Sequence, residues 1–139
     1  MEILSVRQPW AWLIVNGLKD IENRSWSTRY RGPLLIHAGQ RFESHELEGI
    51  LNRLDAAERQ RFPMDRSAFQ HGGIIGIANL VDVVTDSQSK WFEGEGYYGW
   101  RLENARLLPF IPLRGSLGLL NVPPEIAERV QQACADTSL

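Results

Sequence analysis

Three charged side chains of different chemistry lie close together near the start of the chain, at Lys19, Glu22 and Arg24. In a cleft, Lys19 and Arg24 would bind phosphate or carbonyl oxygens, and Glu22 would accept a hydrogen bond from a base amino group. A partly desolvated Lys19 could instead act as a base or activate a nucleophile, with Glu22 as its partner. As a third alternative, Glu22 and Arg24 form only a surface ion pair, which contributes roughly 0–1 kcal/mol to stability.

The backbone conformation of this segment decides which of the three side chains can meet. We expect a short helix over residues 9–16, ended by Gly17, and then an extended segment over residues 21–26. In a strand, Glu22 and Arg24 would share one face, and Lys19 would point to the opposite side of that strand.

Aromatic side chains follow the charged segment and return later in the chain. Trp26 is a candidate for the rim of a pocket, and Tyr98 and Trp100 are two residues apart, so that they would share one face of a strand. An aromatic face that stacks on a splayed-out base contributes about 1–3 kcal/mol. We expect Trp10 and Trp12 to belong to the core instead.

The hydrophobic pattern predicts an α+β fold. With 139 residues we expect one domain, over residues 1–139, built as a small β-barrel of five or six strands flanked by helices. A clear amphipathic pattern predicts one long helix over residues 44–61. The expected strands are residues 3–6, 21–26, 33–38, 72–84, 97–108 and 115–122, and the expected helices are residues 9–16, 44–61 and a last one from 123 onward.

The histidines and the cysteine do not suggest a metal or redox site. The three histidines lack the spacing of metal ligands, so we expect no metal and no cofactor. His37 ends an apolar run and should form hydrogen bonds within the fold. The single cysteine, Cys134, rules out an internal disulfide framework and is compatible with a cytoplasmic location.

The charge is unevenly distributed along the chain. The net charge is −2, but residues 1–41 carry +3 and the remainder carries −5. A local positive face on an acidic body suits contact with a short stretch or a single nucleotide better than a long duplex. No apolar run approaches the length of a membrane span and no signal peptide is evident, so we expect no membrane partner.

The segment at 17–24, GLKDIENR, fits the G-x-K-x-x-E-x-R signature of the ASCH domain, the activating signal cointegrator homology domain. The chain resembles this family along nearly its whole length. The supporting landmarks are QPWA at 8–11, Trp26, RG at 31–32, IHAG at 36–39, GWRL at 99–102 and GSLGLLNVP at 115–123.

The resemblance implies a barrel similar to that of PUA domains, with a ligand cleft beside the signature. RNA or a nucleotide, or single-stranded DNA, would be the partner, recognised through an exposed or modified base. The residues expected at the ligand are Arg7, Gln8, Lys19, Glu22, Arg24, Trp26, Arg29, His37, Tyr98 and Trp100.

Two other functions are open within the same family. Some members resemble this chain in size and are hydrolases that remove the acetyl group from N4-acetylcytidine, and RNA cleavage has been proposed for others. If the chain is an enzyme, Lys19 and Glu22 are the expected catalytic residues. The amidohydrolase pattern, however, has a threonine three residues after the lysine, where this chain has Glu22. A non-catalytic protein-interaction module is the remaining alternative.

Overall fold

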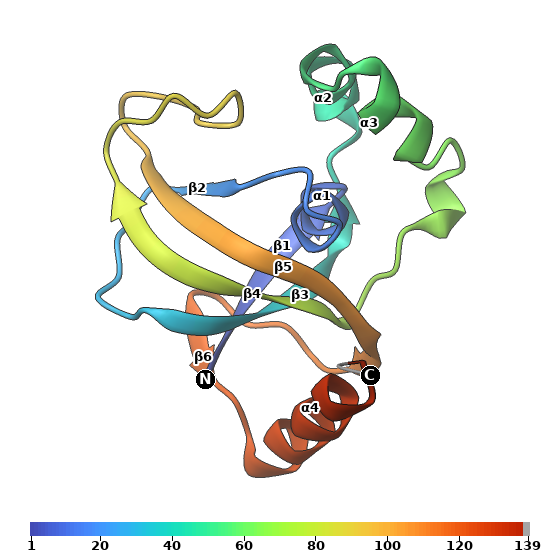
Figure 1. Cartoon of the computed structure of the whole chain (residues 1–139), viewed down its shortest axis with the longest axis vertical. Coiled ribbons are helices and arrows are strands. Elements are labelled where there is room, and N and C mark those ends of the chain that lie inside the picture. The colour runs from blue at the N-terminus through green and yellow to red at the C-terminus, as the bar shows by residue number, and fades with distance from the viewer. Residues whose placement is uncertain (138–139) are drawn as a thin grey trace.

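The computed structural model describes residues 1–137, and it shows the predicted α+β fold. Figure 1 shows one curved sheet with helices packed around it. The strands are β1 (Glu2–Gln8), β2 (Ile21–Arg24), β3 (Gly32–Phe42), β4 (Gly73–Val84), β5 (Tyr98–Pro112) and β6 (Leu119–Asn121). The helices are α1 (Trp10–Val15), α2 (Leu47–Arg53), α3 (Ala56–Arg61) and α4 (Pro124–Thr137), with short 3₁₀ turns at Ser44–Glu46 and Arg66–Ala68.

The six strands form one sheet in the order β2-β5-β4-β3-β1-β6. The pairing of β1 with β3 is parallel, and the other pairings are antiparallel. Within the described residues, β2 and β6 remain the two edges of the sheet, so backbone pairing does not close the predicted barrel. The curvature nevertheless brings β2 near β1, as the side-chain contacts described below show.

The central strands are buried because their apolar residues are continuous rather than alternating. Of the predicted buried strand over residues 33–38, residues 34–38 are buried, but Pro33 is exposed and the strand itself is longer. Gly76 in β4 lies at a register shift, and a Cβ atom there would lie 2.4 Å from Cγ1 of Val15. Glycine at this position therefore lets α1 pack directly against the sheet.

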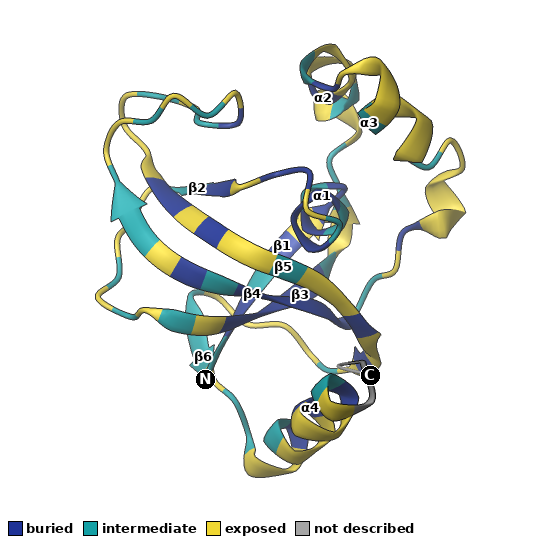
Figure 2. Ribbon diagram, in the orientation of Figure 1, coloured by how far each residue is buried: buried dark blue, intermediate teal, exposed yellow. Residues whose placement is uncertain are grey.

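The predicted long helix over residues 44–61 is wrong. The chain forms α2 and α3 instead, separated at Leu54, whose backbone is extended (φ −84°, ψ 137°). Asp55 caps α3: its Oδ1 accepts from the Glu58 N–H at 2.8 Å, and Glu58 Oε1 accepts from the Asp55 N–H at 2.9 Å. This capping box starts a new helix and overrides the apolar periodicity. Most residues along both helices are exposed (Figure 2).

The last part of the chain differs from the prediction in its strand lengths. β5 includes Pro109 and ends at Pro112, so it is longer than predicted, and β6 is only three residues long. Residues 113–118 between them, here called the strap, cross the sheet without regular structure. The predicted face of α4 is confirmed, because Ile126, Val130 and Ala133 are all buried. No helix in the described part of the chain is long and apolar enough to cross a membrane.

Candidate functional site

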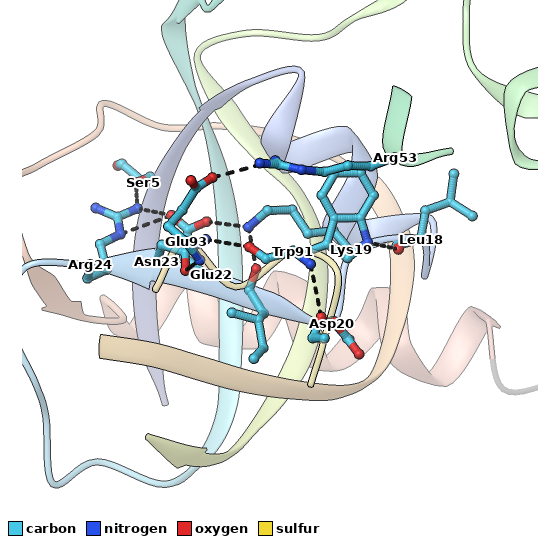
Figure 3. A network of polar contacts seen from close by, with 12 residues as sticks. Ser5, Leu18, Lys19, Asp20, Glu22, Asn23, Arg24, Arg53, Trp91 and Glu93 are labelled. Carbon is cyan, nitrogen blue, oxygen red and sulfur yellow. Dashed lines mark hydrogen bonds and ion pairs between the residues drawn. The ribbon is translucent and has the colours of Figure 1, made fainter. Parts of the chain in front are cut away.

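The three signature side chains meet in one polar cluster (Figure 3). Lys19 Nζ donates to Glu22 Oε1 at 3.0 Å and to the carbonyl oxygen of Ile21. Arg24 Nε donates to Glu22 Oε2 at 3.0 Å. Each carboxylate oxygen is therefore bound by a different cation, and all three charges act as one unit.

Strand geometry alone would have placed Lys19 on the side opposite Glu22. Lys19 precedes β2, in the turn that leaves α1, and its backbone N–H donates to the carbonyl oxygen of Leu13 at 3.0 Å. The turn frees Lys19 from the alternation of the strand, so that its side chain reaches the face on which Glu22 and Arg24 lie.

The cluster is buried, which excludes a simple surface ion pair. The exposed fraction of the side chain is 2% for Lys19, 10% for Glu22 and 22% for Arg24. Burial by itself would raise the pKa of Glu22, but the charges and hydrogen bonds of Lys19 and Arg24 hold that pKa below its ordinary value. Glu22 is therefore a carboxylate, not a carboxylic acid, at neutral pH.

A cavity of about 670 Å³, here called the first cavity, opens beside this cluster. Its walls come from β1, α1, β2, β3 with the turn that follows it, the loop before β5 and the end of the strap. The aromatic residues in the lining are Trp10, Trp26 and Tyr97, and the polar and small ones include Ser5, Asn23, Ser25, Gly39, Ser116 and Gly118. The predicted hollow beside the signature is thus present.

The electrostatic character of the first cavity differs from the positive face that the N-terminal sequence suggested. Distant segments contribute carboxylates to it, and Arg7 Nη1 is already bound to Glu43 Oε1 at 2.7 Å. The charged lining residues are three cations (Arg7, Lys19 and Arg24) and four carboxylates (Glu22, Glu43, Glu46 and Glu93). Glu93 is also paired with Arg53 at 3.5 Å, so positive and negative charges around the first cavity nearly balance. The cavity therefore lacks the excess of positive charge that would attract phosphate, and its carboxylates can accept hydrogen bonds from amino groups.

Of the aromatic residues predicted to stack, only Trp26 lines the first cavity. Trp100 is fully buried: its Nε1 donates to the carbonyl oxygen of Trp26 at 3.2 Å, and the two rings meet edge to face at 4.9 Å. A stacking role for Trp100 is therefore ruled out, and it supports Trp26 instead. Tyr98 is exposed but lies outside the lining, and its neighbour Tyr97 is the tyrosine that reaches the cavity.

Two further predicted residues, Gln8 and Arg29, lie outside the lining of the first cavity. Gln8 is buried and both ends of its amide are occupied, since Nε2 donates to the carbonyl oxygen of Gln70 and Oε1 accepts from the Trp12 N–H, each at 2.9 Å. Gln8 therefore orients α1 and cannot contact a ligand directly. Arg29 is exposed and lies outside the cavity lining.

His37 forms hydrogen bonds within the fold, as the sequence predicted. Its Nδ1 is 3.1 Å from Ser5 Oγ, and its Nε2 is 2.5 Å from the carbonyl oxygen of Leu113. The carbonyl can only accept, so Nε2 carries a proton. Among residues 1–137, no group of three His, Cys, Asp or Glu side chains is placed to hold a metal ion.

Residues 4–114 match the family model of the ASCH domain. The chain belongs to the ASCH domain family. Activating signal cointegrator 1 from Homo sapiens is 38% identical over 90 residues, and the protein of the same name from Mus musculus is 38% identical over 88 residues. The match covers 63% and 61% of this chain but only 15% of either relative.

Solved ASCH structures share the fold. The crystal structure of ASCH from Zymomonas mobilis superposes with a TM-score of 0.58 at 15% identity, and the match covers 94% of this chain and 93% of that one. A structure of a single-substitution mutant of that protein gives a TM-score of 0.57. At this identity the likeness shows that the two domains share a fold and shows nothing about the ligand of this one.

Sequence reasoning missed the contacts by which the loop before β5 brings Glu93 to the first cavity of this ASCH domain. Asn23 Nδ2 donates to the carbonyl oxygen of Trp91, and Asn23 Oδ1 accepts from the Glu93 N–H, both at 2.9 Å. Trp91 is buried, and its Nε1 donates to the carbonyl oxygen of Leu18 at 2.8 Å. A tryptophan within a polar loop was the available signal that this loop packs against the domain.

Proposed function

We propose that this ASCH domain binds a single exposed or modified base, in RNA or in a nucleotide, within the first cavity. The observation that carries the proposal is the buried, ionised carboxylate of Glu22 at the cavity wall, held by Lys19 and Arg24. The cavity volume of about 670 Å³ falls within the range of roughly 300–1,000 Å³ typical of small-ligand sites.

Glu22 has acceptor capacity left for a ligand. An ionised carboxylate offers about four acceptor positions. Arg24 contacts Oε2 through both Nε and Nη2, whereas Lys19 occupies one position on Oε1, which leaves the other position on Oε1 for a ligand. A base amino group is the complementary donor. We therefore expect adenine, cytosine or guanine derivatives to bind better than uracil, which has no exocyclic amino group.

The aromatic walls supply the second part of base recognition. Trp26 is held in place by Trp100, so its ring is already ordered before a ligand arrives. Tyr97 lies in the lining and is 44% exposed. A base between such faces would gain stacking energy without much loss of side-chain freedom.

The geometry supports binding better than proton abstraction by Lys19. A general base must offer a free lone pair, whereas Lys19 Nζ donates to Glu22 and to the carbonyl oxygen of Ile21. Removing its proton would break a buried ion pair. Lys19 is therefore assigned to orienting Glu22, and the hydrolase alternative has no supporting observation at this residue.

The test compares two neighbouring tyrosines. Fluorescence anisotropy with labelled eight-nucleotide single-stranded RNAs should show oligo(A) and oligo(C) binding more tightly than oligo(U). Tyr97→Ala should weaken binding by about 1–3 kcal/mol, and Tyr98→Ala should leave it unchanged. Equal effects of the two substitutions, or no base preference, would contradict the proposal. Release of cytidine from N4-acetylcytidine, lost in Glu22→Gln, would favour the hydrolase alternative instead.

A further inference from the structure

A second cavity of about 760 Å³ lies on the other side of the strap. It extends over β3 and Gly72, the residue before β4, and is bounded by the strap itself. Four residues line both cavities: Ser5, Gly39, Ser116 and Leu117. A ligand that fills the first cavity can therefore extend past Ser116 into the second without crossing the body of the domain.

The two cavities differ in electrostatic character. The first has four carboxylates in its lining, whereas the only charged side chain in the lining of the second is Arg114. Within the described residues Arg114 forms no hydrogen bond or ion pair, so its guanidinium is available to a ligand. Gln40 and Ser116 add neutral hydrogen-bond donors. The second cavity thus offers an anionic group an unpaired cation and no carboxylate, which the first cavity does not.

The strap holds Arg114 at this cavity. On one side of Arg114, the Leu113 N–H donates to the carbonyl oxygen of Gly72 at 3.1 Å, and the Leu113 carbonyl oxygen accepts from His37. On the other side, a Cβ atom on Gly115 would lie 2.7 Å from Cε1 of His37, so only glycine allows the strap to lie this close. The backbone around Arg114 is thus ordered before any ligand binds.

We infer that the second cavity binds the phosphate attached to the nucleotide whose base occupies the first cavity. This inference rests on the proposed function, since it places the phosphate relative to the bound base. Arg114 forms charge-assisted hydrogen bonds to the phosphate oxygens, and Ser116 and Gln40 complete the contact. The ligand class is therefore a phosphorylated nucleoside, either a mononucleotide or a residue within a single strand, and not a free nucleoside.

The experiment measures affinity by isothermal titration calorimetry for adenosine and cytidine, their 5′- and 3′-monophosphates, and the dinucleotides ApA and CpC. At least one phosphorylated form should bind about tenfold or more tightly than its nucleoside, as expected for one charge-assisted contact. Monophosphates and dinucleotides distinguish a free nucleotide from a strand. Arg114→Ala and Arg114→Glu should abolish the gain from phosphate and leave nucleoside affinity unchanged.

The matched control is Arg129→Ala, since Arg129 is an exposed arginine on α4 that lines neither cavity. It should retain the full gain from phosphate. Nucleoside binding with no gain from phosphate, or a gain that persists in both Arg114 variants, would overturn this inference while the proposed function stands. No binding by any nucleoside, nucleotide or dinucleotide would overturn both.

Discussion

Arg24 Nη2 donates to the backbone carbonyl oxygen of Ser5 at 2.8 Å, and so connects β2, one edge of the sheet, to β1 near the other edge. The carbonyl is accessible because β6 pairs with β1 only as far as Leu4. The same guanidinium binds Glu22. One side chain therefore closes the sheet where backbone pairing does not, and it orders the carboxylate in the candidate site.

Arg24→Ala should destabilise the domain through loss of this link. Hydrogen bonds to a charged group contribute about 1.5–3 kcal/mol when buried, and Arg24 is partly exposed, so we expect a loss of about 1–2 kcal/mol. Urea denaturation measures it. Arg24→Lys should recover only part of the loss, because an ammonium group cannot reproduce the forked geometry. Full recovery by lysine would show that charge alone, and not the connection to Ser5, stabilises the fold.

Lys19→Ala should be more damaging than Arg24→Ala, because Lys19 is the more deeply buried partner of Glu22. Lys19→Ala leaves Glu22 Oε1 without its cation, although Arg24 still binds Oε2. We therefore expect a loss near the lower end of the range for breaking a buried ion pair, roughly 3 kcal/mol in the free energy of unfolding. The double variant with Glu22→Gln should lose less than the sum of the two single variants. Additive losses in chemical denaturation would mean that the two residues are not coupled.

The contribution of Glu22 to the stability of the domain should be lost only below pH 4.5. The pKa of Glu22 is lower in the folded state than its ordinary value of 4.5, so its stabilising contribution is present above that value and is lost as the pH falls through the folded-state pKa. Thermal melting between pH 7 and pH 3 measures this loss. Glu22→Gln should flatten the dependence, and an unchanged slope in this variant would contradict the assignment of Glu22 as a buried carboxylate.

Gly115→Ala should displace the strap from the side chains of Ser5 and His37, against which it packs. The added methyl group would lie 2.8 Å from Ser5 Oγ and 2.7 Å from His37 Cε1, and both side chains are held by hydrogen bonds. We expect a destabilisation of about 1–3 kcal/mol from overpacking. Gly118→Ala is the spatial control, because no atom lies within 4 Å of a Cβ there, although its φ of +68° adds local strain. Amide chemical shifts of residues 113–118 should move much further in Gly115→Ala than in Gly118→Ala.

Much of the fold was predictable because its signals are local. The apolar run at residues 33–38 predicted a buried strand, and all of it except Pro33 is buried. Ile126, Val130 and Ala133 likewise predicted the buried face of α4. The helix over residues 44–61 was mispredicted because a capping box at Asp55 outweighs the apolar period. Here two competing local signals were both present, and their relative strength could not be judged from the pattern alone.

The candidate site likewise has a part that was predictable from the sequence and a part that was not. The sequence by itself determined that Lys19, Glu22 and Arg24 lie near one another and that aromatic residues accompany them, because those relationships depend on short separations along the chain. Only the tertiary structure decided the rest. It placed Tyr97 rather than Tyr98 in the cavity, and it brought carboxylates from distant segments to a region that looked positive in the sequence. Long-range packing sets the surroundings of each charge, and those surroundings decide what a charged side chain can bind.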